Sequence, residues 1–160
     1  MIQDIPRPSV TATVAIWLAL GLLGAIIVGG GLALFPVSDS LARDNPEFAN
    51  LQTPLLVLAL AICASAEIVL FATGMLVGYI WRDRIFDRAA ARMVDLLVGA
   101  VIGGTVLTAC MLPVIPGPPP LALLIIGSVL AGITLVLVLG VLRSLLRRAV
   151  LMRVELDEVV

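Results

Sequence analysis

One acidic residue, Glu67, is the strongest candidate for chemistry in this sequence. It is the single ionisable residue in the apolar run 55–80, and it lies close to the middle of that run. A carboxylate at the centre of a lipid bilayer costs roughly 3 kcal/mol, so such a residue usually faces the protein interior. Two interpretations stay open: a proton or substrate site, or a structural acid that fixes the helix register through hydrogen bonds.

Two hydroxyl residues are expected at the same depth as Glu67. Counting from the ends of their own apolar runs places Thr108 and Ser128 at similar heights. A buried polar layer of Glu67, Thr108 and Ser128 would satisfy the carboxyl group with hydrogen bonds. Gly74 and Gly78, four residues apart on the same face as Glu67, predict a close helix contact beside it.

No other combination of residues predicts catalysis or metal binding. The chain contains no histidine, and its two cysteines, Cys63 and Cys110, both lie inside apolar runs. The sequence also has no nucleophile beside a base, no cluster of metal ligands and no phosphate-binding loop. We therefore expect no enzymatic activity, no cofactor and no metal.

The composition indicates an integral membrane protein. Of the 160 residues 61% are hydrophobic and 13% are charged, and the mean hydropathy is +1.19. Soluble domains contain about 45–50% apolar and about 25% charged residues. The net charge of −1 provides no overall positive charge that would attract nucleic acid. We expect the lipid bilayer as the main partner and no direct contact with nucleic acid.

Four apolar runs are each long enough to cross a bilayer as a helix. A hydrocarbon core of about 30 Å requires about 20 helical residues, and a spanning segment of this kind must be helical. The predicted fold is all-α, with a single membrane domain over 1–160 that forms an integral membrane four-helix bundle. The predicted spans are 12–35, 55–80, 96–115 and 121–142, followed by a C-terminal helix over 143–160.

The connections between the predicted spans differ in character. Residues 36–54 read as a 19-residue loop, long enough for a short surface helix over 40–50. Asp87 is a favourable N-cap for a helix that begins at Arg88 and runs into the third span. The proline-rich segment after the third span lacks amide donors, so it cannot continue a helix.

The distribution of arginine predicts the orientation in the membrane. All ten basic residues are arginine, and only Arg43 lies in the first connection, while the other nine lie in the N-terminal arm, the second connection and the C-terminal segment. Arginine-rich segments stay in the cytoplasm. We expect a multi-pass protein of the bacterial inner membrane, with both termini inside and a last helix that extends into the cytoplasm.

The C-terminal segment carries the clearest pattern for a protein partner. From Leu142 onward, apolar residues recur at alternating spacings of three and four, which is the seam of a coiled coil. The seam is too short for a stable isolated coiled coil, so lipid, the second connection or a partner must cover it. The residues predicted to bind a partner at the inner face are Arg82, Asp83, Arg84, Ile85, Phe86, Leu145, Met152, Glu155, Leu156, Asp157 and Glu158.

Four motifs are distinctive: RDRIF in the second connection, the acid in CASAEIVL, an NPEF-like element, and the ending VLRSLLRRAVLMRVELDEVV. Together they resemble a bacterial membrane family known as domain of unknown function 2975. That family has no established activity, and its genes often lie beside the gene for a small helix-turn-helix regulator. The resemblance therefore marks 82–86 and 155–159 as family-typical elements of unknown role and implies a DNA-binding protein as the membrane-held partner.

Three functions are compatible with these patterns. The first is a regulatory or scaffolding protein whose inner face binds a cytoplasmic partner, such as a small helix-turn-helix regulator. The second is an accessory subunit of a larger membrane complex. The third is a small proton-coupled transporter built around Glu67, with a homo-oligomer as one arrangement. The inner tail favours the first two, and Glu67 favours the third.

The predicted orientation can be tested by cysteine labelling in intact cells. In a background that carries Cys63→Ala and Cys110→Ala, an impermeant thiol reagent added outside should modify Ser40→Cys but not Ser144→Cys, because only the first connection is exposed outside. Permeabilised cells, in which both positions should react, provide the control. Labelling of Ser144→Cys alone would reverse the orientation.

Overall fold

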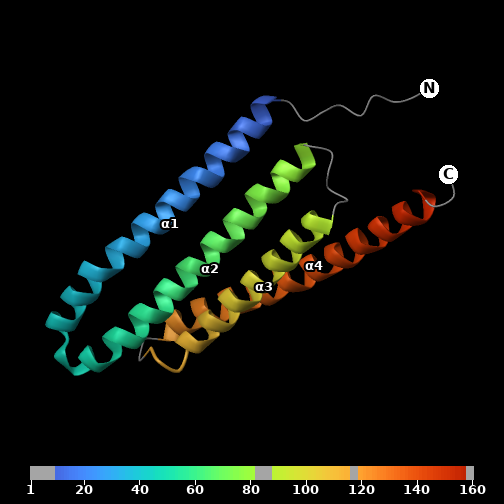
Figure 1. Ribbon diagram of the computed structural model, residues 1–160. Helices are drawn as coiled ribbons and strands as arrows, with labels where there is room; N and C mark the ends of the chain where they lie inside the picture. The colour runs from blue at the N-terminus through green and yellow to red at the C-terminus, as the bar shows by residue number, and fades with distance from the viewer. Residues whose placement is uncertain (1–9, 82–87, 116–118, 158–160) are drawn as a thin grey trace.

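The computed structural model describes residues 10–81, 88–115 and 119–157. Within these ranges the chain forms four long helices and one short one (Figure 1). Throughout these ranges there is no strand, which confirms the predicted all-α class. The elements are α1 (Val10–Asp44), the 3-10 helix η1 (Pro46–Phe48), α2 (Ala49–Trp81), α3 (Arg88–Met111) and α4 (Pro119–Asp157).

All four α-helices are long and apolar enough to cross a membrane. The spanning segments are Thr11–Asp44, Pro46–Trp81, Ala89–Met111 and Pro120–Leu145. Large apolar side chains cover their outer surfaces, and Leu22, Leu123 and Leu137 are each at least 65% exposed. Such surfaces suit the hydrocarbon of a bilayer, which is as apolar as leucine. The chain is therefore a multi-pass membrane protein, as the composition predicts.

The first connection is shorter than the sequence predicts. Helix α1 continues through Pro36 as far as Asp44, and α2 begins at Ala49, so the 36–54 loop and its separate 40–50 helix are wrong. The turn is closed by a backbone hydrogen bond of 2.9 Å from the Asn45 amide to the Leu41 carbonyl. Proline removes one helical hydrogen bond, whereas an open loop in lipid would leave many backbone groups unpaired, so the helix persists.

The other connections agree with the sequence patterns. Helix α3 begins at Arg88, where the second connection predicts a helix start, although Asp87 itself lies outside the described residues. Helix α3 ends at Met111, just before the proline-rich segment, and α4 begins at Pro119. Helix α4 then runs without interruption to Asp157, so the fourth span and the predicted C-terminal helix are one continuous element.

The helices pack in chain order as antiparallel neighbours (Figure 1). Helix α1 packs on α2, α2 on α3 and α3 on α4, while the described parts of α1 and α4 do not contact each other. The bundle is therefore an open row rather than a closed ring. Its buried apolar residues fall mainly on one stripe of α3, because α3 is covered by α2 and α4. They are Ala72, Ala90, Val94, Val98, Val101 and Ile125.

Small residues set the distance between neighbouring helices. Between α1 and α2 the facing residues recur every seven positions on both helices, the spacing of a left-handed supercoil. These facing pairs are Trp17 with Gly74, Gly24 with Glu67, and Gly31 with Leu60. Gly104 faces Ser65 between α2 and α3, and Gly132 faces Thr105 between α3 and α4. Every interface thus contains at least one glycine at a point of close approach.

The contact between α3 and α4 leaves no room for a side chain at Gly132, so we expect Gly132→Ala to lower the thermal stability. An added Cβ would lie 3.1 Å from the Thr105 Cβ, which cannot move without shifting the helix. Overpacking of this kind costs about 1–3 kcal/mol. Thermal unfolding in detergent measures the effect.

Gly127→Ala is the matched control on the same helix. No atom lies within 4 Å of a Cβ built at Gly127, so this change should leave the melting temperature unchanged or raise it slightly. Equal melting temperatures for the two variants would contradict the packing described between α3 and α4.

Candidate functional site

An acid on α3 joins two arginines on α4 at the end of the bundle where α3 begins. Asp95 Oδ1 accepts a hydrogen bond from Arg143 Nε, and Asp95 Oδ2 accepts one of 3.1 Å from Arg147 Nη2. Arg143 and Arg147 are four residues apart and therefore share a face of α4. Each carboxylate oxygen has its own partner, so Asp95 fixes α4 against α3 where the fourth span ends. We call these three residues the Asp95 clamp.

The Asp95 clamp was not among the residues predicted from sequence. The signal in the sequence is the opposite charge of Asp95 and Arg143, which stand just before the third predicted span and just after the fourth. Helices α3 and α4 are antiparallel, so these two span ends lie at the same end of the row. Counting outward from the turn does not pair the two residues, because Asp95 is 16 residues before the end of α3 and Arg143 is 24 residues after the start of α4.

The residues predicted to bind a partner are only partly described. Leu145 lies on α4 beyond the clamp residue Arg143 and is 58% exposed, as Leu142 is at 52%. The first two positions of the predicted seam are therefore uncovered. Met152, Glu155, Leu156 and Asp157 lie on the helical backbone of α4, whereas Arg82, Asp83, Arg84, Ile85, Phe86 and Glu158 lie outside the described residues.

Glu67 faces α1. A Cβ built at Gly24 of α1 would lie 3.5 Å from the Glu67 Oε2 atom, so the missing side chain of Gly24 makes space for the carboxyl group. Ser65, two residues earlier on α2, faces Gly104 of α3 instead. Positions two apart on a helix point about 200° away from each other. Helix α2 therefore turns Ser65 toward α3 and Glu67 toward α1.

The predicted hydrogen-bonded layer of Glu67, Thr108 and Ser128 is not formed. Thr108 Oγ1 donates to the Gly104 carbonyl at 2.8 Å, and Ser128 Oγ donates to the Leu124 carbonyl at 2.9 Å. Glu67 Oε1 is buried and has no hydrogen-bond partner. Counting from the ends of a run gives a depth but no direction around the helix. Hydroxyl groups in apolar helices also find a ready acceptor four residues back.

The Glu67 carboxyl group lines a groove of about 340 Å³ between α1 and α2. The other lining residues are apolar or glycine: Trp17, Leu20, Gly21, Gly24, Ala25, Leu70, Phe71, Gly74 and Met75. The Trp17 ring packs 3.4 Å from the position of a Cβ on Gly74, whereas a Cβ on Gly78 would meet nothing within 4 Å. Of the predicted glycine pair, only Gly74 makes a close contact. The groove offers one carboxyl group in an apolar setting, which can hold a proton or accept a hydrogen bond.

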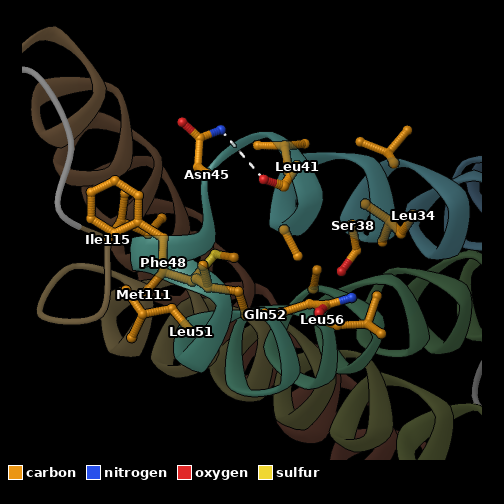
Figure 2. Close-up of a pocket in the computed structure, with 14 residues that line it drawn as sticks. Leu34, Ser38, Leu41, Asn45, Phe48, Leu51, Gln52, Leu56, Met111 and Ile115 are labelled. Atoms are coloured by element: carbon orange, nitrogen blue, oxygen red, sulfur yellow. Dashed lines mark hydrogen bonds between the residues drawn. The ribbon is translucent and has the colours of Figure 1, made fainter.

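A larger cavity of about 390 Å³ lies at the opposite end of the row, where α1 turns through η1 into α2 (Figure 2). Phe48, Met111 and Ile115 lie together at one side of it, and Leu34 and Leu56 lie at the other. Only Ser38, Asn45 and Gln52 among its lining residues are polar. The complete lining is Leu34, Val37, Ser38, Leu41, Ala42, Asn45, Phe48, Leu51, Gln52, Leu55, Leu56, Ala59, Met111 and Ile115.

Sequence reasoning missed this cavity because it treated residues 36–54 as a loop. The lining residues of α1 recur at spacings of three, one, three, one and three from Leu34 to Asn45, which is the pattern of one helix face. The lining residues of α2 from Leu51 to Ala59 show the same pattern. This periodicity was visible in the sequence and is the signal that identifies both segments as helical.

Among the residues that the structure describes, no group of three histidine, cysteine, aspartate or glutamate side chains is placed to hold a metal ion.

One family model matches the chain, over residues 37–160, and its description reads protein of unknown function (DUF2975). The match begins within α1 and therefore includes the turn, the second connection and all of α4. No curated protein and no solved structure matches the chain.

Replacing a buried polar residue by an apolar one usually lowers the thermal stability, but the Glu67 Oε1 atom has no hydrogen bond to lose. We expect Glu67→Leu to raise the thermal stability in detergent, because a buried polar group without a partner costs about 1–3 kcal/mol. Glu67→Gln should remain close to the wild type, because it keeps both the shape and a polar group.

Thr108→Val serves as the comparison, since it removes a hydroxyl whose hydrogen bond is already satisfied within its own helix. A lower melting temperature for Glu67→Leu would mean that the folded protein provides the carboxyl group with a hydrogen-bond partner.

Proposed function

Since the chain belongs to the DUF2975 family, we propose that it is a non-enzymatic regulatory or scaffolding protein of the inner membrane. In this proposal it holds a cytoplasmic protein at its arginine-rich face, and both termini lie inside. The observation that carries the proposal is the continuity of α4, which leaves the fourth span and continues to Asp157 as the same helix.

The length of α4 supports a role beyond anchoring. The fourth span is complete by about Leu145, and the helix continues for twelve residues after it, about 18 Å at 1.5 Å per residue. A helix that only ended a span would stop or turn near the lipid surface. An extension of this length instead presents a surface at a fixed direction from the membrane, as a docking helix does.

The Asp95 clamp supports a coupling between the membrane helices and this extension. Asp95 holds Arg143 and Arg147, which lie at the point where α4 passes from span to extension. A change in the position of α3 is therefore transmitted to the base of the extension. Exposed ion pairs contribute only about 0–1 kcal/mol each to stability, so we assign the clamp a positioning role rather than a stabilising one.

The chemistry of the extension indicates the kind of partner. Its seam continues the pattern that starts at Leu142 and Leu145 at the end of the fourth span, and its tip carries Glu155, Asp157 and Glu158. A tail with apolar side chains beside three carboxylates complements a partner surface that is basic and also carries apolar residues. DNA-binding proteins have basic surfaces. The proposed partner is a small helix-turn-helix regulator, the class that the family resemblance implies. Binding to the tail would compete with binding to DNA.

A second candidate function, proton-coupled transport, is favoured by one specific observation. The buried Oε1 atom of Glu67 has no hydrogen-bond partner and lies in the groove between α1 and α2. A carboxyl group in this position can take up and release a proton without breaking a hydrogen bond. Loss of proton-linked uptake in Glu67→Gln, with stability intact, would favour transport over regulation. No observation on the described residues favours an accessory subunit in particular.

The regulatory proposal is tested by expressing the intact protein, or a form that stops after Arg153, together with a small helix-turn-helix regulator encoded beside its gene, if one exists. The intact protein should retain the regulator in the membrane fraction, and the shortened form should release most of it into the soluble fraction. Retention should fall as the salt concentration rises, because charge attraction contributes to it.

A charge-matched pair of variants provides the control. Glu155→Gln with Asp157→Asn removes two carboxylates from the tail, and Asp44→Asn with Glu47→Gln removes two at the opposite end of the row. Only the first pair should release the regulator. Equal membrane recovery of the regulator with the intact and shortened forms would refute the proposal and leave the tail as a lipid-facing or self-associating helix.

A further inference from the structure

We propose that the cavity at the turn between α1 and α2 is a binding site for a single-chain, uncharged amphiphile whose head group donates hydrogen bonds, such as a monoacylglycerol. This proposal concerns the end of the row opposite the Asp95 clamp and does not depend on the regulatory function. It rests on the shape of the cavity, the hydrogen bonds of its polar residues, and the charge beside it.

The cavity has the size and composition of a small-molecule site. Its volume of about 390 Å³ falls in the range of about 300–1,000 Å³ that is usual for such sites. Eleven of its fourteen lining residues are apolar, and no charged residue is among them. It draws on four elements, α1, η1, α2 and the end of α3 (Figure 2). A chain of methylene groups suits such walls.

The two amide side chains in the cavity are oriented by hydrogen bonds within the protein. Gln52 Nε2 donates to Asp39 Oδ1 at 2.8 Å, and Asn45 Nδ2 donates to the Leu41 carbonyl at 3.3 Å. One N–H of each amide is thereby engaged. The two carbonyl oxygens stay available as acceptors and the second N–H of each amide as a donor, so a hydroxyl group, which both donates and accepts, complements the site.

The charge near the cavity selects against an anionic head group. The Asp39 carboxylate accepts a hydrogen bond from Gln52, so a negative charge lies next to one of the polar residues that line the cavity. No arginine is among the lining residues to balance the charge of a bound anion. A fatty acid in its ionised form would meet like charge and find no cation. A monoacylglycerol has a similar tail but carries two hydroxyl groups and no charge.

The position of the polar residues also orients the ligand. Asn45 and Gln52 lie near the turn, whereas Leu34 and Ala59 are farther along α1 and α2, away from it. A head group at the turn would sit at the level where the helices end, and its tail would extend between α1 and α2 toward the middle of the membrane. This is the direction in which lipids of the same leaflet already lie.

Photolabelling of the full chain in phosphatidylcholine vesicles tests the site. The probe is a monoacylglycerol with a diazirine in its tail, and labelled peptides are mapped by mass spectrometry. We expect label within residues 34–45 and 51–59. Unlabelled monoacylglycerol should compete at a concentration at least about ten-fold lower than the fatty acid of the same chain length, which corresponds to about 1.4 kcal/mol.

Two alanine-to-phenylalanine substitutions on α1 distinguish labelling inside the cavity from labelling by general contact with lipid. Ala42 lines the cavity, whereas Ala33 is exposed on the same helix and is not a lining residue. Ala42→Phe fills the space and should reduce labelling about ten-fold, while Ala33→Phe should leave it unchanged. Thermal unfolding of both variants shows whether each is folded.

A third variant tests the charge argument without altering the shape. Asp39→Asn keeps an acceptor for Gln52 but removes the negative charge, so the fatty acid should then compete almost as well as the monoacylglycerol. Equal competition by both ligands on the unaltered chain would overturn the proposal, as would label spread over all four helices. If Ala42→Phe fails to fold, the ranking of the two competitors on the unaltered chain decides the matter alone.

Discussion

Close packing at a few small residues is the constraint on which the arrangement of these helices depends. In a bilayer, apolar side chains gain little by leaving lipid for another helix, so association relies on van der Waals contact at short distance and on polar groups. The chain meets this requirement with Gly24, Gly31 and Gly74 between α1 and α2, and with Gly104 and Gly132 on either side of α3. Because each contact joins neighbours in the sequence, the outcome is an open row of helices.

The same constraint explains how polar groups are distributed. Hydroxyl side chains such as Thr105 and Thr108 return their hydrogen bonds to their own helices. Asp39 and Asp95 each accept hydrogen bonds from a neighbouring helix, one at each end of the row. Two buried oxygens on the described residues, Thr13 Oγ1 and Glu67 Oε1, are left without a hydrogen-bond partner, and Glu67 is the ionisable one of the two. A group that the fold does not satisfy is a natural place for function.

Helix α3 connects the two ends of the molecule. Its last turn contributes Met111 to the cavity near the turn of α1, and Asp95 near its start holds the base of the α4 extension. These residues are sixteen positions apart, about 24 Å along one rigid helix. α3 also carries most of the buried apolar residues, so it is the best-packed element of the row. A ligand in the cavity would contact α3 directly, and a protein partner on the α4 extension would be linked to α3 through the Asp95 clamp.

Patterns along the chain were enough to predict the membrane class, the four spanning helices, the start of α3 at Arg88 and the unbroken course of α4. These features follow from local rules, since lipid requires helical backbone wherever residues are apolar for long enough. The same patterns also identified Glu67 as the unusual acid. The predicted length of the first connection is wrong, because α1 continues through Pro36 as far as Asp44 although proline usually ends a helix.

Which face of each helix meets a neighbour depends on how the helices pack together and could not be predicted from the chain. Glu67 lies against Gly24 rather than beside Thr108 and Ser128, because the rotation of α2 is fixed by the glycine contacts along α1. Apolar residues surround every helix, so no stripe in the sequence marks the buried face. The pairing of Asp95 with Arg143 and the cavity around Gln52 depend on the same rotations. Depth in a membrane can be counted along a chain, but direction around a helix axis is set by packing.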